Sequence, residues 1–226
     1  MKRASEVISE PDRASLRDAI QDAERSTSGE LVCVLATQSG DYDRAEDLMG
    51  LWLGVGLLAA AWWLMSAAPT GEWGPAELRV TWVELLFGLG LLFGGFVLGA
   101  ALAARVGWLR RLLTTEAQME AEVVRAADRV YFQRNLGRTR ARTGVLIYLS
   151  LFERRVRIVG DAAIAERLGD GDFVEVRDAI LAGLRGGSLA DGLRAGIRLC
   201  GEKLSRHFPR SADDRDELSN ELILLD

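Results

Sequence analysis

Two long apolar stretches interrupt a chain that otherwise shows the shorter apolar patterns of helices and strands. The first runs from Leu48 to Ala68 and the second from Trp82 to Ala104. Because an α-helix rises about 1.5 Å per residue, each stretch is long enough to cross a hydrocarbon core about 30 Å thick. Neither contains Lys, Arg or Asp. With the polar link Pro69–Pro75 between them, the two stretches predict a transmembrane helical hairpin.

The alternative is a pair of buried core helices, which fits less well because ordinary core helices keep a polar stripe. A membrane hairpin would return the chain to its starting side, so that residues 1–44 and 108–226 face one compartment. Four arginines flank the spans on that side: Arg44, Arg105, Arg110 and Arg111. Only Arg79 lies in the link. This excess of positive charge predicts that the shared side is cytoplasmic.

The remaining pattern alternates between helical and strand segments. Helices are predicted at 9–26, 115–137, 162–168, 173–186 and 188–207, and strands at 30–36, 144–151 and 154–159. The first two strands are continuous apolar runs, which is typical of strands buried on both faces. Only Phe152 and Glu153 separate the last two strands, which favours an antiparallel hairpin. From Pro209 the chain turns acidic and is expected to be irregular, with 222–225 as a docking tip.

Composition removes several classes of function. The net charge of −5 gives no general signal for nucleic-acid binding. Cys33 and Cys200 lie in apolar sequence and are expected to be buried free thiols. His207, the only histidine, suits the C-terminal end of the last helix. No phosphate-binding loop or nucleophile elbow occurs, so neither nucleotide binding nor a hydrolytic triad is indicated.

Asp161 is the strongest candidate for chemistry, because it directly follows a predicted strand and α/β sheets place ligands at strand ends. With Asp170, Asp172 or Asp191 it would form an oxygen-ligand site for Ca²⁺ or Mg²⁺. The spacing matches no defined metal-binding loop. The alternative is that Asp161 and Asp191 cap helices and that the other carboxylates are solvated.

Arginines also cluster around the second and third strands: Arg134, Arg138, Arg140, Arg142, Arg154, Arg155 and Arg157. This basic block would bind a phosphate-bearing ligand or an anionic membrane surface, or it would pair with the acidic C-terminal half of the chain.

Glycines recur four residues apart within the spans, at Gly50 and Gly54, Gly90 and Gly94, and Gly95 and Gly99. Small residues at this spacing let helices approach closely in lipid. The motifs would serve closure of the hairpin alone, or homodimerisation through the glycine-rich spans as well.

Three segments resemble the TPM domain family: Thr27–Val34, Arg138–Ile147 and Phe152–Asp161. A bacterial subgroup also shares His207-Phe-Pro-Arg and Asp216-Glu-Leu. The resemblance implies an α/β fold, a small sandwich with a mostly parallel sheet flanked by helices, interrupted here by the two-helix hairpin. We therefore expect a discontinuous TPM-like domain at 1–44 and 108–208, the hairpin at 45–107 and an acidic tail at 209–226.

Members of the family are linked to photosystem repair, receptor assembly and membrane-protein maintenance, and some are described as phosphatases with an acidic metal site. Typical members follow the third strand with a Gly-Tyr-Gly-Leu-Glu-Gly turn, whereas this chain reads Gly160-Asp-Ala-Ala-Ile164. The altered turn favours a non-catalytic scaffold or maintenance factor for membrane proteins, at the cytoplasmic face of the bacterial inner membrane. A metal-dependent phosphatase using an acidic cluster around Asp161 is the alternative.

Overall fold

The computed structural model describes residues 3–66, 82–211 and 217–226. The chain divides into two compact units, a smaller one of Asp41–Thr115 and a larger one of Lys2–Gly40 with Glu116–Asp226. The predicted link Pro69–Pro75 lies outside the described residues, as does Arg79.

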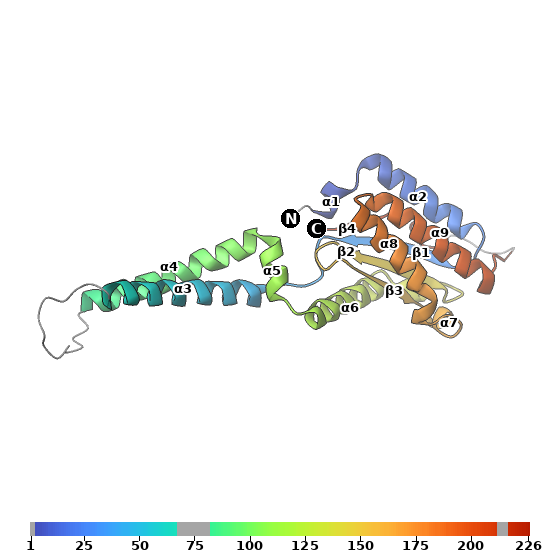
Figure 1. Ribbon diagram of the computed structural model, residues 1–226. Helices are drawn as coiled ribbons and strands as arrows, with labels where there is room; N and C mark the ends of the chain where they lie inside the picture. Colours follow the sequence, from blue (N-terminus) through green and yellow to red (C-terminus); the bar gives the residue numbers. More distant parts are fainter. Residues whose placement is uncertain (1–2, 67–81, 212–216) are drawn as a thin grey trace, which may run out of the picture. The chain divides into compact units, whose positions relative to one another are not determined.

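A four-stranded sheet in the order β3-β2-β1-β4 forms the centre of the larger unit (Figure 1). β1 (Glu30–Ala36) and β2 (Gly144–Ser150) run parallel. β3 (Arg155–Gly160) returns antiparallel to β2, and β4 (Ile223–Leu225) joins the other edge parallel to β1. The mostly parallel sheet and the antiparallel hairpin between β2 and β3 are therefore confirmed.

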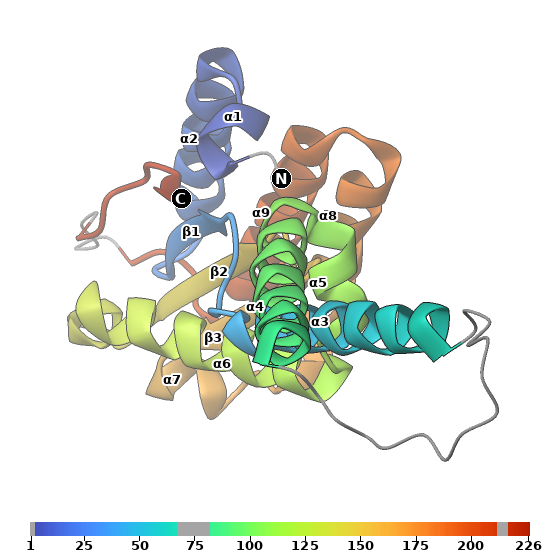
Figure 2. The same ribbon diagram turned by 90° about the vertical axis from the view of Figure 1, so that its left-hand side faces the viewer.

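Helices cover both faces of this sheet. The core on one face includes residues of α2 (Glu10–Glu24), α8 (Val174–Gly186) and α9 (Leu189–His207), whereas the core on the other face is formed with α6 (Glu116–Gln133) (Figures 1 and 2). Short helical segments complete the unit: α1 (Ala4–Val7), η1 (Leu136–Arg138), α7 (Ala162–Ala165) and η2 (Asp170–Phe173). The fold is thus an α/β sandwich of three layers.

The continuous apolar runs in β1 and β2 are explained by these two layers. In β1, Leu31, Cys33 and Leu35 belong to the core beneath α2, α8 and α9. Val32 and Val34 alternate with them and belong to the core beneath α6. Successive side chains of a strand point to opposite faces, so a strand between two helical layers needs apolar residues at every position.

Local end signals set the helix boundaries as predicted. The Ser9 hydroxyl accepts a hydrogen bond from the Asp12 N–H at 3.3 Å and caps α2. Gly187 follows α8 with φ of +80°, a left-handed conformation that glycine adopts without strain. Both signals depend on neighbouring residues alone, which is why the sequence contains them.

The last residues of the chain depart from the expected irregular tail. Ile223, Leu224 and Leu225 form β4 and pair with Val34, Leu35 and Ala36. The expected docking tip at 222–225 therefore takes the form of an edge strand. Three apolar residues are too few to show a strand period, and the pairing is decided by the exposed edge of β1.

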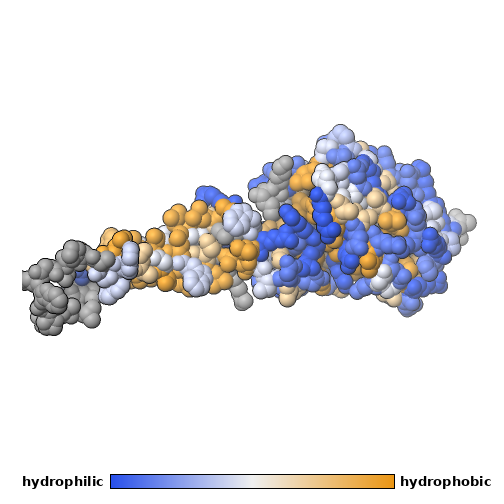
Figure 3. Space-filling model, in the orientation of Figure 1, coloured by the Kyte–Doolittle hydropathy of each residue, from blue (hydrophilic) through white to orange (hydrophobic). Residues whose placement is uncertain are grey.

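The smaller unit consists of α3 (Asp43–Ser66), α4 (Trp82–Arg105) and α5 (Gly107–Leu113). Figure 3 shows hydrophobic residues gathered over the surface of α3 and α4. By length and composition, Glu46–Ser66 and Trp82–Arg105 are able to cross a membrane, and only 11% of the most apolar window of each is buried. A core helix of a soluble protein would be mostly buried instead.

Glycines bring α3 and α4 together. A Cβ atom on Gly95 would lie 2.6 Å from the Gly54 Cα, and one on Gly99 would lie 2.9 Å from the Gly50 Cα. In contrast, a Cβ atom on Gly90 or Gly94 would meet no described atom within 4 Å. Gly50 and Gly54 on α3 therefore pack against Gly95 and Gly99 on α4 and close the hairpin. Gly90 and Gly94 lie on a face of α4 that is open among the described residues.

Candidate functional site at the carboxyl edge of the sheet

The parallel strands end together at one edge of the sheet. Ala36 of β1 lies opposite Ser150 of β2 and Leu225 of β4, so three carboxyl ends meet there. In open α/β sheets, ligands bind outside the carboxyl ends of the strands. The carboxyl ends of β1, β2 and β4 therefore form the candidate site, which is called the carboxyl edge here.

Glu153, in the turn between β2 and β3, is the central residue of this edge. Glu153 is only 1% exposed. The Ser39 N–H donates to Glu153 Oε1 at 2.9 Å, and the Ser150 hydroxyl donates to Glu153 Oε2. Buried carboxylates need such partners because an uncompensated charge is costly away from water. Glu153 thus ties the chain that leaves β1 to the turn that follows β2.

Tyr148 extends this cluster. Its hydroxyl lies 3.1 Å from the Ser39 hydroxyl, and the residue is 1% exposed. Burial raises the pKa of the Tyr148 phenol above its ordinary value, while the bond to Ser39 acts in the opposite direction. Because Ser150 is fully buried and Glu153 nearly so, neither is placed to meet a substrate. We call the cluster of Ser39, Tyr148, Ser150 and Glu153 the clamp, because it holds the backbone of Ser39 against the turn that follows β2.

Both segments that lead to the smaller unit leave the sandwich near this edge. Gly40 lies against Glu122 of α6, where a Cβ atom would come within 2.4 Å of Glu122 Cγ. Arg155, at the start of β3, makes ion pairs with Glu116 and Glu120 in the first turns of α6. The clamp therefore holds the segment that follows β1, and Arg155 holds the start of α6. No motif in the sequence predicts either contact. The one available signal was the position of Ser39 and Glu153 just after strand ends.

Asp161 lies at the other end of the strands, where β1 and β2 begin. Because β3 runs antiparallel, Gly160 pairs with Val145, near the start of β2. Asp161 is 9% exposed and caps α7, with Oδ1 accepting the Ala162 N–H at 2.6 Å. The predicted capping role of Asp161 is therefore present. Asp161 follows β3, which runs antiparallel to β2. Its Oδ2 is buried without a hydrogen bond within the described part of the chain.

Tyr131 of α6 lies beside Asp161. A Cβ atom on Gly137 would be 3.3 Å from the Tyr131 hydroxyl and 3.7 Å from Asp161 Oδ1, so both oxygens border the same small space. Burial, and then the charge of Asp161, raise the pKa of Tyr131 to about 12. The phenol therefore stays protonated at physiological pH beside the carboxylate.

Asp191 has a separate environment in the first turn of α9. It accepts from the Ser188 hydroxyl and pairs with Arg194, and these contacts hold the pKa of its exposed carboxyl below the ordinary value. Asp170 pairs instead with Arg157 at 3.6 Å. Within residues 3–66, 82–211 and 217–226, no three His, Cys, Asp or Glu side chains gather as a metal site would require. Because Ca²⁺ and Mg²⁺ take six or more oxygen ligands, a metal ion at Asp161 would need water or substrate oxygens to complete its coordination.

The arginines of the basic block are divided between the two ends of β2. Arg138, Arg140 and Arg142 precede β2, whereas Arg154 and Arg155 lie beyond its other end. The Arg140 N–H donates to the Glu217 carboxylate at 3.0 Å. Pairing with the acidic C-terminal half, one of the two alternatives, is present between Arg157 and Asp170, whereas Arg155 pairs with Glu116 and Glu120 of α6.

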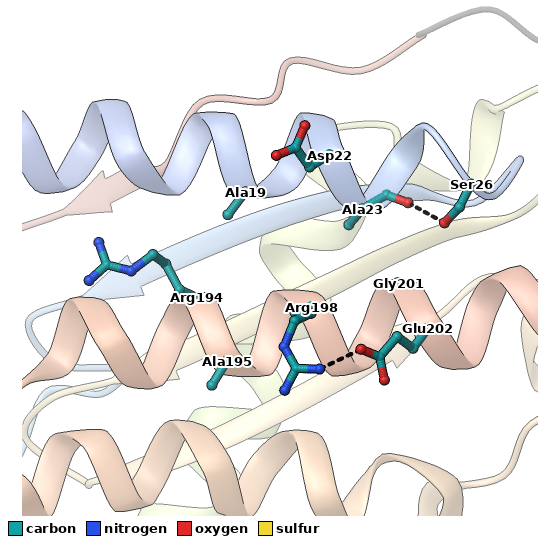
Figure 4. A pocket seen from close by; sticks show the side chains of 9 residues that line it. All are labelled: Ala19, Asp22, Ala23, Ser26, Arg194, Ala195, Arg198, Gly201 and Glu202. Atoms are coloured by element: carbon teal, nitrogen blue, oxygen red, sulfur yellow. Dashed lines mark hydrogen bonds and ion pairs between the residues drawn. The ribbon is translucent and has the colours of Figure 1, made fainter.

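A groove of about 390 Å³ lies between α2 and α9 (Figure 4). Small side chains form its floor, and the charges at its rim are paired: Arg198 with Glu202, Arg194 with Asp191, and Asp22 with Arg25. The lining residues are Ala19, Asp22, Ala23, Ser26, Arg194, Ala195, Arg198, Gly201 and Glu202. Paired rim charges leave this groove without a group poised for catalysis.

The thiols are also inert. Cys33 and Cys200 are buried and free, as expected, and burial raises the pKa of each to about 12. A thiol is a nucleophile only as thiolate, so neither cysteine is suited to covalent chemistry.

Comparison with known proteins supports the fold and its family. A family model described as the TPM domain matches residues 100–203. No curated protein was found to match the sequence. The chain is similar to the NMR structure of the BA42 protein from the psychrophilic bacterium Bizionia argentinensis, with 21% identity, a TM-score of 0.56 and coverage of 99% of each chain. At this identity the similarity establishes the fold alone.

Proposed function

On the match of the TPM domain model to residues 100–203, we propose that this chain is a TPM-domain protein integral to the membrane, and that its α/β unit serves as a non-catalytic scaffold or maintenance factor for membrane proteins. The observation that carries the proposal is the exposed apolar surface of α3 and α4, inserted between β1 and α6. The clamp at the carboxyl edge supports it, because Glu153 is buried and accepts hydrogen bonds from the Ser39 N–H and the Ser150 hydroxyl.

The exposed side chains of the hairpin are what a bilayer would cover. Trp52, Trp63 and Phe93 are 69%, 68% and 71% exposed. Burying apolar surface contributes about 25 cal/mol per Å², so such a surface is strongly driven out of water. We propose the bacterial inner membrane as its location, with both chain ends on the cytoplasmic side, because Arg105 and Arg111 flank the spans there.

Alkaline carbonate extraction of bacterial membranes tests the anchoring. The tagged full chain is expected to stay in the membrane pellet and to require detergent for release. Its release by carbonate would contradict an integral hairpin. A reporter fused after Asp226 tests the orientation separately, and activity only outside the cytoplasm would contradict the cytoplasmic assignment while leaving the anchoring intact.

A metal-dependent phosphatase is the second candidate, and the buried, unpartnered Oδ2 of Asp161 is the observation that favours it. Hydrolysis of a phosphate ester by the full chain, with Ca²⁺ or Mg²⁺ added, tests this function. Metal-dependent turnover that is lost in Asp161→Asn, and retained in the matched Asp191→Asn, would replace the scaffold proposal. We expect no turnover in any of the three proteins.

Association of two copies through the spans is a further part of the proposal. Gly90 and Gly94 lie four residues apart on α4, and a Cβ atom on either would meet no described atom within 4 Å, unlike one on Gly95 or Gly99. In lipid, an open face of small residues allows close contact with a second helix. The lipid bilayer, membrane proteins and a second copy of this chain are therefore the proposed partners, and nucleic acid is not.

A further inference from the structure

The last ten residues of the chain, Glu217–Asp226, run along the outer edge of β1 and are called the strap here. At its start, the N–H groups of Glu217 and Leu218 donate to the carboxylate of Glu30, at 3.4 Å and 3.3 Å. Glu30 is the first residue of β1, and β4, the end of the strap, pairs with the last three residues of β1. The strap is therefore held at both ends of one strand.

Side chains of the strap enter both layers of the sandwich. Leu222 and Leu224 pack against the core beneath α2, α8 and α9. Ile223 and Leu225 pack against the core beneath α6. All four are only partly buried, because no further strand covers them within the described residues. Alternate aliphatic residues of the strap thus pack on the two faces of the sheet beside β1.

The strap ends in a polar anchor. The Asp226 carboxylate accepts from the Ser5 N–H at 3.1 Å and from the Ser5 hydroxyl, and it lies 3.2 Å from the Thr37 hydroxyl. The Thr37 N–H donates to the Leu225 carbonyl at 2.8 Å. These bonds hold the pKa of Asp226 below its ordinary value, chiefly through Ser5. The β1 edge therefore holds three aliphatic residues followed by a carboxylate.

We propose that the strap is an exchangeable strand, and that the β1 edge of one copy takes the strap of a second copy of this chain. The contacts that hold the strap at Glu30, along β1 and at Ser5 depend on the strap's own residues, so a strap supplied by another copy makes the same bonds. Only three residues of the strap are in the β ladder, so few ladder bonds have to open for the strap to leave. Domain swapping exchanges an identical element between protomers at low cost, and an uncovered sheet edge is a template for a strand of another chain. The occupant is a second copy because the contacts along the β1 edge match the sequence of this strap.

Disulfide trapping between two differently tagged full-length chains tests the exchange. One chain carries Ala36→Cys and the other carries Leu225→Cys, at positions that face each other across β1 and β4. Neither chain can form this disulfide within itself, so an oxidised heterodimer requires a strap from the other copy. Cys33 and Cys200 are buried with pKa values of about 12 and stay out of the reaction.

The matched control replaces Leu225→Cys with Asp178→Cys, an exposed position on α8, which contacts β3 at the opposite edge of the sheet. After co-expression and oxidation, we expect the Ala36 and Leu225 pair to give at least tenfold more heterodimer than this control. A single chain with both substitutions establishes that the pair closes, and Val34→Cys with Ile223→Cys supplies a second register. Heterodimer at the control level in both registers would show that the strap stays within its own chain and would overturn the proposal.

Discussion

Glu153 is the residue on which the carboxyl edge depends most. Its replacement by Ala leaves the part-buried Ser39 N–H and the buried Ser150 hydroxyl without their acceptor. A buried polar group left unpaired costs about 1–3 kcal/mol, so the loss at Ser150 is expected to lower the free energy of unfolding of Glu153→Ala by about that amount. Denaturant unfolding of the purified chain in detergent measures the difference.

Glu166, an exposed residue at the end of α7, provides the matched control. Substitutions at exposed positions without special contacts usually change stability by less than about 0.5 kcal/mol. Equal midpoints for Glu153→Ala and Glu166→Ala would mean that the clamp contributes nothing to the fold.

The raised pKa of Tyr131 is expected to make the free energy of unfolding depend on pH in the alkaline range. The folded protein raises its pKa from 10.0 to about 12, so the folded state binds the phenolic proton more tightly than the unfolded state does. The contribution is fully present below pH 10 and is lost as pH rises through about 12. Unfolding experiments between these pH values are expected to show a steeper loss for the natural chain than for Tyr131→Phe.

Asp161→Asn tests the cause of that shift, since it removes the charge and keeps a capping side chain. The pKa of Tyr131, followed by tyrosinate absorbance, is expected to fall toward its ordinary value but not to reach it, because burial is the larger cause. An unchanged pKa would show that the carboxylate does not act on the phenol.

At the scale of elements, the two glycine motifs of α4 predict opposite results. Gly95→Leu places a side chain against the Gly54 backbone, which cannot move aside, so the two helices must separate. We expect a loss of about 1–3 kcal/mol, as for other overpacked sites, in thermal unfolding followed by tryptophan fluorescence. Gly90→Leu meets open space and is expected to leave the hairpin intact.

The same pair of variants separates closure from association. If two copies contact through the Gly90 and Gly94 face, Gly90→Leu lowers the dimer fraction in detergent without changing the unfolding of the hairpin. A dimer fraction equal to that of the natural chain would remove this face from the proposed contact.

Most elements were predictable because their signals are local. Glu30–Ala36 is an unbroken apolar run, and Ser9 and Gly187 mark helix ends through contacts with near neighbours. β4 was missed, because Ile223–Leu225 becomes a strand only by pairing with β1, which is distant in the sequence. Asp161 was correctly placed after a strand, but the antiparallel direction of β3 puts it away from the edge where β1 and β2 end.

At the scale of the whole molecule, the α/β unit is expected to fold without the hairpin. None of the buried residues in its two cores, within the described part of the chain, comes from Asp41–Thr115. Replacing residues 43–113 by a flexible Gly/Ser linker should therefore give a soluble protein with a cooperative unfolding transition. Circular dichroism and denaturant unfolding measure this. A protein that lacks a cooperative transition would mean that the sandwich needs the hairpin to form.

The sequence by itself determined the apolar stretches, the strands β1, β2 and β3, the helix caps and the buried thiols. These features follow from residue type, periodicity and contacts within a few positions. Only the tertiary structure decided that Glu153 meets Ser39, 114 positions away, that the strap closes the β1 edge, and that Asp161 and Asp191 lie in separate environments. Such contacts depend on strand direction and register, which arise when distant segments pack and are written in no single segment.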